Sequence, residues 1–250
     1  MKKLTALILV SLICVSVLCG CNGEAHTPAE TLPAETTVPV TEVQADYEEV
    51  YAEILDETYD LIIADKAEVQ LSSGQTGIAE AVAGSDSDKA LGVVGYMFKD
   101  LTGDGFAELI IADVAESEDS WFKTSEIFAI YTVAFDMPLL LAEGTARSSY
   151  KLLDDGTFLY EGSGGAAYTG VGNFRMSNGG MSLVCNEFYF TEPDEADPNT
   201  VYVYKNTSGK WDTELSEKTD LSLDDIEDIR AGYEEKLVSL ELTAFSEYNK

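Results

Sequence analysis

Apolar residues follow a helical period near both ends of the chain and a shorter, interrupted pattern between them. In the first helical stretch one face carries Tyr47, Val50, Tyr51, Ile54, Leu55, Leu61 and Ile62. This spacing predicts an amphipathic helix over 46–70. Asp46 followed by Glu49 has the spacing of a capping box, so we expect the helix to begin at Asp46.

From residue 92 onward the pattern changes to short apolar runs separated by Gly, Asp and Asn. Three of the breaks carry the residues that tight hairpin turns need: Asp155-Gly156, Asn178-Gly179-Gly180 and Thr207-Ser208-Gly209. Consecutive strands joined by such short turns pair antiparallel. The strands are expected at 92–99, 107–114, 126–135, 139–142, 146–153, 157–161, 168–176, 181–190, 200–205 and 210–215.

The last part of the chain returns to the helical period. It predicts a helix over 223–240, with Ser222 and Asp225 as residues that can cap its start. A short helical turn is expected at 78–83. The pattern as a whole predicts an α+β fold, an antiparallel β-meander sheet flanked by N-terminal and C-terminal helices, in a single globular domain over 46–250.

The first 20 residues have the pattern of a secretory signal. Two lysines precede an apolar run from Leu4 to Leu18, and small residues follow it. The segment Leu18-Cys19-Gly20-Cys21 resembles the lipobox of bacterial lipoproteins. This resemblance implies cleavage between Gly20 and Cys21, and acylation of Cys21 by palmitate or a similar chain. The alternative is an uncleaved membrane anchor, although the run is shorter than the roughly 18 apolar residues that span a bilayer.

The stretch that follows, 21–45, is rich in Thr, Pro, Glu and Ala and has no aromatic residue. Such a composition is typical of a disordered tether. Together with an acylated Cys21, it predicts a lipid-anchored protein on the extracellular side of the cell membrane, with the lipid bilayer as one partner.

The chain is strongly acidic, with 46 acidic and 15 basic residues and a net charge of −31. Such a field repels phosphate groups, so we expect no nucleic acid partner. Solubility at an exposed surface and a dedicated acidic binding face both remain open as reasons for this charge.

Cysteine and histidine usage restricts the chemistry further. Once the signal is removed, Cys21 and Cys185 remain of the four cysteines, and acylation of Cys21 leaves no pair for an internal disulfide. Cys185 lies in an apolar run and is expected to be a buried structural thiol. The single histidine, His26, lies in the tether, which argues against histidine-based catalytic triads and zinc sites.

The segment from Asp100 to Glu108 has the composition of a cation loop. Oxygen-bearing side chains alternate along a tight, glycine-containing turn, which suits a hard cation. The expected ligands of a structural calcium ion are Asp100, Thr102, Asp104, Phe106 through its carbonyl, and Glu108.

Ile111 occupies the position where an EF-hand would need a bidentate acid. The loop instead resembles the strand–loop–strand calcium loops of FG-GAP and VCBS-type repeats, and departs from them at Thr102, where Asp or Asn is usual. The alternative interpretation is a hairpin turn with solvated acids.

Two further features bear on ligand binding. The segment Gly162–Tyr168 is rich in small residues, which is typical of a hairpin connection and also of a loop that contacts a ligand. Aromatic residues alternate along the expected strands, as core residues do and as sugar-stacking platforms do. The chain contains 13 Tyr and 10 Phe.

The order of parts is similar to that of a group of uncharacterised surface lipoproteins from Gram-positive bacteria. The similarity rests on the lipobox, the tether, the Lys99–Leu109 segment, the run Tyr150–Thr157, the Gly162–Tyr168 segment and the ending Leu240–Tyr248. It implies an architecture and a location, and no activity. We therefore expect a monomeric, membrane-tethered extracellular binding module that is stabilised by calcium and binds a glycan or a protein. The alternative is an extracellular hydrolase that acts on glycans with a pair of carboxylates.

Overall fold

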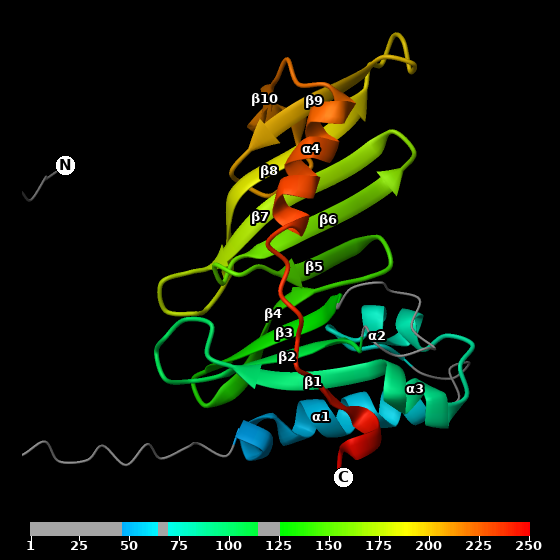
Figure 1. The fold of residues 1–250 in the computed structure, drawn as a ribbon, viewed down its shortest axis with the longest axis vertical. Coiled ribbons are helices and arrows are strands. Elements are labelled where there is room, and N and C mark those ends of the chain that lie inside the picture. The colour runs from blue at the N-terminus through cyan, green and yellow to red at the C-terminus, as the bar shows by residue number, and fades with distance from the viewer. Residues whose placement is uncertain (1–46, 65–69, 115–125) are drawn as a thin grey trace, which may run out of the picture. The chain divides into compact units, whose positions relative to one another are not determined.

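The computed structural model describes residues 47–64, 70–114 and 126–250. Within these residues the strands form one antiparallel sheet of eleven strands, in the order β10-β9-β8-β7-β6-β5-β3-β2-β1-β11, with β4 paired to β3 (Figure 1). The predicted α+β fold with a β-meander is therefore confirmed. The strands are β1 Val94–Lys99, β2 Glu108–Asp113, β3 Ile127–Ala134, β4 Met137–Glu143, β5 Ser148–Leu152, β6 Phe158–Gly165, β7 Tyr168–Met176, β8 Leu183–Pro193, β9 Val201–Asn206, β10 Glu217–Lys218 and β11 Thr243–Ala244.

Four α-helices and two 3-10 helices accompany the sheet in the described part of the chain. They are α1 Tyr47–Ile63, α2 Thr76–Ala81, α3 Ser87–Val93, α4 Leu223–Glu234, η1 Thr213–Leu215 and η2 Phe245–Glu247. None of the described helices is long and apolar enough to cross a bilayer. The compact unit that contains them spans Val43–Lys250.

The N-terminal helices cover one face of the strands at the β1 end of the sheet. Tyr51 and Leu55 of α1 are fully buried against Leu109 and Ile111 of β2. The alternate residue Ile110 belongs to a second cluster, on the other face of the same strand. β2 is thus buried on both faces, which explains its unbroken apolar sequence.

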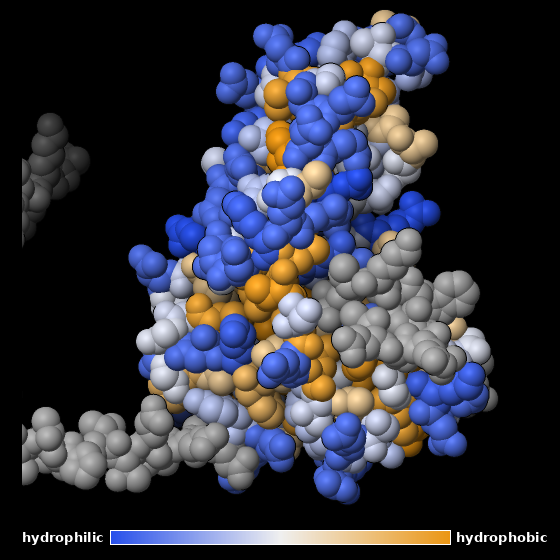
Figure 2. All heavy atoms as spheres, viewed as in Figure 1, coloured by the Kyte–Doolittle hydropathy of each residue, from blue (hydrophilic) through white to orange (hydrophobic). Residues whose placement is uncertain are grey.

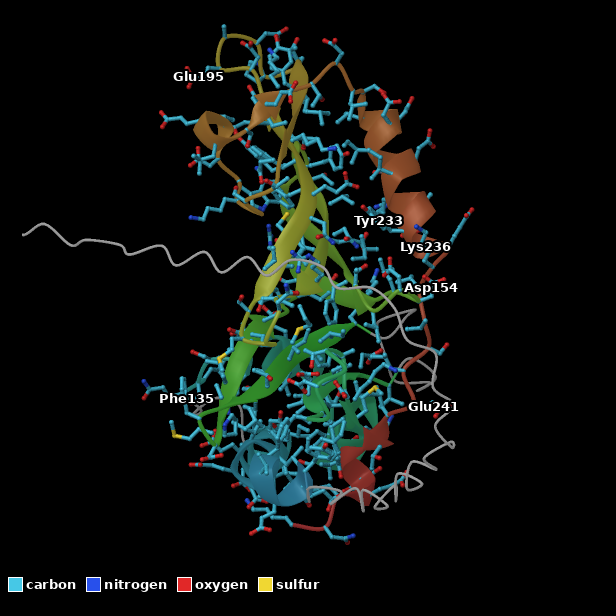
Figure 3. All side chains as sticks on the ribbon, turned by 90° about the vertical axis from the view of Figure 1, so that its left-hand side faces the viewer. Phe135, Asp154, Glu195, Tyr233, Lys236 and Glu241 are labelled. Carbon is cyan, nitrogen blue, oxygen red and sulfur yellow. The ribbon has the colours of Figure 1, made fainter. Side chains whose placement is uncertain are left out.

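Helix α4 covers one face at the other end of the sheet. Ser222 and Asp225, the predicted cap residues, form a capping box at the start of α4, and its apolar face packs on β6–β9 through Ile226 and Ile229. Near the end of the helix, Tyr233 lies toward the sheet (Figure 3) and donates a 2.5 Å hydrogen bond to Glu187. Figure 2 shows that the outward surface of α4 is largely hydrophilic, as expected for a helix with one buried face.

Both long helices are shorter than the sequence predicted. The 46–70 prediction ends at Ile63, just after the buried pair Leu61 and Ile62, while residues 65–69 and the predicted cap Asp46 lie outside the described residues. The 223–240 prediction was wrong beyond Glu234. There the chain becomes extended, because Leu237 pairs with Leu153 and Val238 packs into the second cluster.

The strand predicted at 210–215 was also wrong. This segment contains η1 instead, because Asp212 caps a short helical turn through the amide of Glu214, at 2.9 Å. Helix α3 was missed, although Asp86 caps it in the usual way by accepting from the amide of Lys89.

The turn between β3 and β4 is built without glycine. Phe135 and Asp136 both adopt left-handed backbone conformations, with φ of 53° and 62°. Strand β3 therefore ends at Ala134, and Phe135 projects from the tip of the hairpin (Figure 3).

Candidate functional site

The predicted cation loop joins β1 to β2 and closes around the carboxylate of Asp100. Oδ1 of Asp100 accepts hydrogen bonds from the amides of Thr102 (3.1 Å) and Gly103 (2.6 Å), and Oδ2 accepts from Gly105 (2.9 Å). Gly103 and Gly105 have φ of 75° and 88°, which glycine adopts without steric cost. Slight burial opposes the charge on Asp100, but these hydrogen bonds outweigh it and hold its pKa below the usual range.

Thr102 and Asp104 complete this network. Thr102 Oγ1 lies 3.3 Å from Asp100 Oδ1, to which it donates, and accepts from the amide of Asp104 at 3.3 Å. Asp104 Oδ1 accepts from the amide of Phe106 at 2.9 Å. Helix α1 supports the loop from outside, because Tyr47 donates to the carbonyl of Gly105 at 2.9 Å.

Glu108 differs from the other predicted ligands because it is buried, with 2% of its surface exposed. Its Oε2 accepts from the amide of Leu101 at 2.8 Å, and its Oε1 accepts from Thr132 Oγ1 at 3.2 Å. Burial raises the pKa of Glu108, more than these two hydrogen bonds lower it, and the charge of Asp104 raises it further.

The five predicted ligands thus lie in one hairpin. The carboxylates of Asp100 and Asp104 accept hydrogen bonds from the loop itself, and that of Glu108 accepts from the loop and from Thr132 of β3. In the parts of the chain that the structure describes, no three His, Cys, Asp or Glu side chains are grouped so that they could hold a metal ion. Calcium binding stays a prediction. The alternative of a turn with solvated acids does not describe Glu108, which is buried.

A second candidate site lies at the hairpin between β6 and β7. It is a hollow of about 350 Å³, which we call the aromatic hollow. Its lining residues are Arg147, Tyr160, Ser163, Gly164, Tyr168 and Trp211. Tyr168 and Trp211 are 39% and 38% exposed, so ring surface remains open to a ligand.

The sheet register places glycines where the aromatic rings of the hollow need room. Gly162 pairs with Gly170 across β6 and β7, on the same face as Tyr160. A Cβ atom at Gly170 would lie 2.4 Å from the Trp211 ring, and one at Gly162 would lie 2.6 Å from the Tyr160 hydroxyl. Glycine at both positions therefore lets the two rings lie close to the sheet.

Buried rings hold these two side chains from behind. The centroid of Phe188, which is fully buried, lies 5.8 Å from those of both Tyr160 and Trp211. Phe190 lies 5.7 Å from Trp211 and 5.8 Å from Phe188. Aromatic contacts at these separations are favourable, and they fix the walls of the hollow before any ligand arrives.

Trp211 lies in an irregular segment between β9 and β10, and Asn206 holds this segment. The Asn206 amide group donates to the carbonyl of Lys210 and to Ser216 Oγ, both at 2.8 Å. Its carbonyl oxygen accepts from the amides of Ser208 and Gly209, both at 2.9 Å. The segment lies on the sheet face opposite α4 (Figure 3).

Arg147 stands at the rim of the aromatic hollow. Its backbone is tied to β6, because its carbonyl accepts from the amide of Ser163 at 2.9 Å. Its side chain is exposed, and it makes no ion pair or side-chain hydrogen bond with any residue that the structure describes. The other two arginines differ, since Arg175 is bonded to Asn186 and Arg230 is paired with Glu227.

Arg147 and Ser163 also line a second hollow of about 450 Å³, which faces α4 and which we call the polar hollow. Within it Lys151 Nζ lies 2.5 Å from Glu161 and 3.8 Å from Glu126. Burial raises the pKa of Glu126, although Lys151 opposes this rise. The polar hollow therefore contains a pair of carboxylates around one ammonium group.

Sequence reasoning found part of this arrangement. It named the Gly162–Tyr168 segment as a hairpin or a ligand loop, and the hairpin is present, between β6 and β7. It missed Arg147, Tyr160 and Trp211. For Trp211, a tryptophan close to the turn residues Thr207-Ser208-Gly209 was a usable signal.

The two remaining site predictions concern cysteines. Cys21 lies outside the described residues. Cys185 is a free thiol in β8, half-buried rather than fully buried, and desolvation raises its pKa to about 11, as expected of an unreactive thiol.

Comparisons with protein-family models, with curated proteins and with solved structures find no significant match to the chain.

Replacement of Glu108 by Gln tests whether burial raises the pKa of this carboxyl group. The folded state holds the Glu108 proton more tightly than the unfolded chain, so wild-type stability falls as pH rises from 4.5 through the folded pKa. Glu108→Gln removes this loss and keeps an acceptor for the Leu101 amide. In chelator, the stability of the variant relative to the wild type should increase as the pH rises from 4 to 8. Urea unfolding at pH 4 to 8 measures it.

Glu53→Gln removes the same charge from an exposed position of α1 and serves as the control. A difference between Glu108→Gln and wild type that stays constant over this pH range would contradict the assigned role of burial.

Proposed function

We propose that the chain is a lipid-anchored extracellular binding module whose ligand site is the aromatic hollow. The observation that carries this proposal is the pair of ring walls, Tyr160 and Trp211, set over glycines and backed by the buried ring of Phe188. A preformed concave surface with open aromatic rings and a few polar groups suits a binding site. Flat rings of this kind stack on the faces of sugar rings, so a glycan is the ligand that the geometry favours over a protein.

The location belongs to the same proposal and rests on the lipobox-like segment. Acylation of Cys21 would hold the domain at the extracellular side of the cell membrane, and the net charge of −31 would keep it clear of nucleic acids. A monomer is sufficient for this role, because all residues of the aromatic hollow come from one chain.

The location has a direct test. Metabolic labelling with palmitate should label the wild-type protein and Cys185→Ser, and should fail to label Cys21→Ser. Intact mass spectrometry of the native protein should give a chain that begins at an acylated Cys21. Recovery of an unmodified Cys21 would contradict the anchor.

The ligand site is tested with a glycan and peptide array probed with the mature chain. Trp211→Ala should weaken binding to the glycans recognised by the wild type by about tenfold or more, since it removes one stacking wall. Phe106→Ala is the matched control, because it removes an aromatic ring that is 58% exposed outside the hollow. Equal effects of the two substitutions, or binding to peptides alone, would contradict the proposal.

A glycan hydrolase is the second candidate, and the carboxylate pair of the polar hollow favours it. Glu126, with its raised pKa, suits a general acid, and Glu161 lies 2.5 Å from Lys151 and 4.0 Å from Arg230. Shortening of a bound glycan during the array experiment, lost in Glu126→Gln, would favour this candidate over a binding module.

We also propose that the Asp100–Glu108 loop binds calcium as a structural ion. Support comes from the left-handed glycines, which curve the loop, and from the carboxylates of Asp100 and Asp104 on its exposed side. Calcium would neutralise the negative charges of these two carboxylates, and Thr102 and the Phe106 carbonyl would be neutral ligands. Glu108 would join it only by exchanging one of its present hydrogen bonds.

Calcium binding predicts a shift in thermal stability. Millimolar calcium should raise the unfolding midpoint by a few degrees over that in chelator, because a ligand that binds only the folded state stabilises it. Asp104→Asn should reduce this shift, and Asp136→Asn, which changes an acid in a different turn, should retain it. Identical midpoints in calcium and chelator would show that the hydrogen bonds of the loop suffice.

A further inference from the structure

Arg147 is the one arginine of the chain whose side chain has no partner among the described residues, and it stands at the rim of the aromatic hollow. The chain contains 46 acidic residues, so an exposed guanidinium group has many candidate partners. Arg230 and Lys151, which line the polar hollow, are paired with Glu227 and Glu161. An unpaired guanidinium at a concave site has its donors free for a ligand.

The charge around the two hollows differs from that of the whole chain. Arg147, Lys151 and Arg230 line the polar hollow together with two acids, Glu126 and Glu161. The lining of the polar hollow thus carries three basic and two acidic side chains, in contrast to the net charge of −31, and Glu80 lies close by, where it accepts from the amide of Ala146 at 2.6 Å. Since exposed charges beyond about 10 Å are largely screened at ordinary ionic strength, this local balance governs the contact with a ligand.

The geometry of the guanidinium group narrows the ligand class. Its planar fork binds a carboxylate through two parallel hydrogen bonds, and such bonds are stronger than those between neutral groups. Tyr160 and Trp211 supply the apolar walls beside it. A sugar ring that carries a carboxylate presents both a stacking face and a matching anion.

We propose that the aromatic hollow recognises carboxylated sugars, with Arg147 as the residue that binds the carboxylate. This inference rests on the proposed function of the aromatic hollow and adds the chemical class of its ligand. The ring of such a sugar lies against Trp211 and Tyr160, and its carboxylate meets the guanidinium group at the rim. Neutral sugars occupy the same walls without that contact.

The test compares each acid with its own methyl ester, which has the same ring and lacks the charge. Oligogalacturonate and sialyllactose, each with its ester, are titrated calorimetrically into the mature full chain. At least one acid should bind about tenfold more tightly than its ester. Arg147→Gln should abolish the difference in affinity between that acid and its ester.

Two further variants separate the possible outcomes. Arg175→Gln removes the same charge from the opposite end of β7, and it should leave both affinities unchanged. Trp211→Ala should weaken the acid and the ester alike. Equal binding of acid and ester with dependence on Trp211 would overturn the inference and leave the proposed function standing. Failure of both acids to bind, or equal losses in Arg147→Gln and Arg175→Gln, would also overturn it.

Discussion

The register between β6, β7 and β8 is the constraint on which the candidate site depends. Gly162 faces Gly170, and Gly172 faces Phe188, so that small and large residues alternate across one face of the sheet. Since side chains alternate between the faces of a strand, a slip of one residue would carry every member of this set to the face under α4. The hydrogen-bond ladder thus decides where the rings lie, and their positions are fixed before any contact with a ligand.

The same register gives the two faces of the sheet different side chains. On the α4 face, Val171 and Tyr189 join the helix in an apolar cluster. On the opposite face, Trp211 packs beside Phe188 and stays 38% exposed. Helix α4 therefore covers one face of these strands, and the aromatic hollow lies on the other.

Nearby hydrogen-bond donors stabilise the carboxylates of the loop between β1 and β2. Asp100 is satisfied by three loop amides, and Glu108 is satisfied by one amide and one hydroxyl group inside the sheet. Carboxylates bonded in this way need no nearby cation to remain in the fold. The hydrogen bonds of the loop therefore suffice to define its conformation. A bound calcium ion would add to the stability of the folded state.

Local signals in the sequence predicted the sheet well. Asp155-Gly156 forms the expected turn, with φ of 79° at the glycine. The ends of the helices were predicted less well, because Leu237 and Val238 fit a helical period and also fit the extended pairing that burial selects. The aromatic hollow was beyond prediction, since Arg147, Tyr160 and Trp211 come from three segments that only the sheet register brings together.

The position of Trp211 is the part of the site that secondary structure supports least. Its segment ends in β10, a strand of two residues, which by itself offers little pairing. Asn206 compensates, because its buried side chain bonds to the backbone or side chains of four residues in that segment. Displacing the segment would leave the buried Asn206 amide without hydrogen-bond partners, which is energetically unfavourable. This penalty keeps the segment in place. Asn206 therefore fixes the Trp211 wall of the aromatic hollow, and packing against Phe188 fixes the Tyr160 wall.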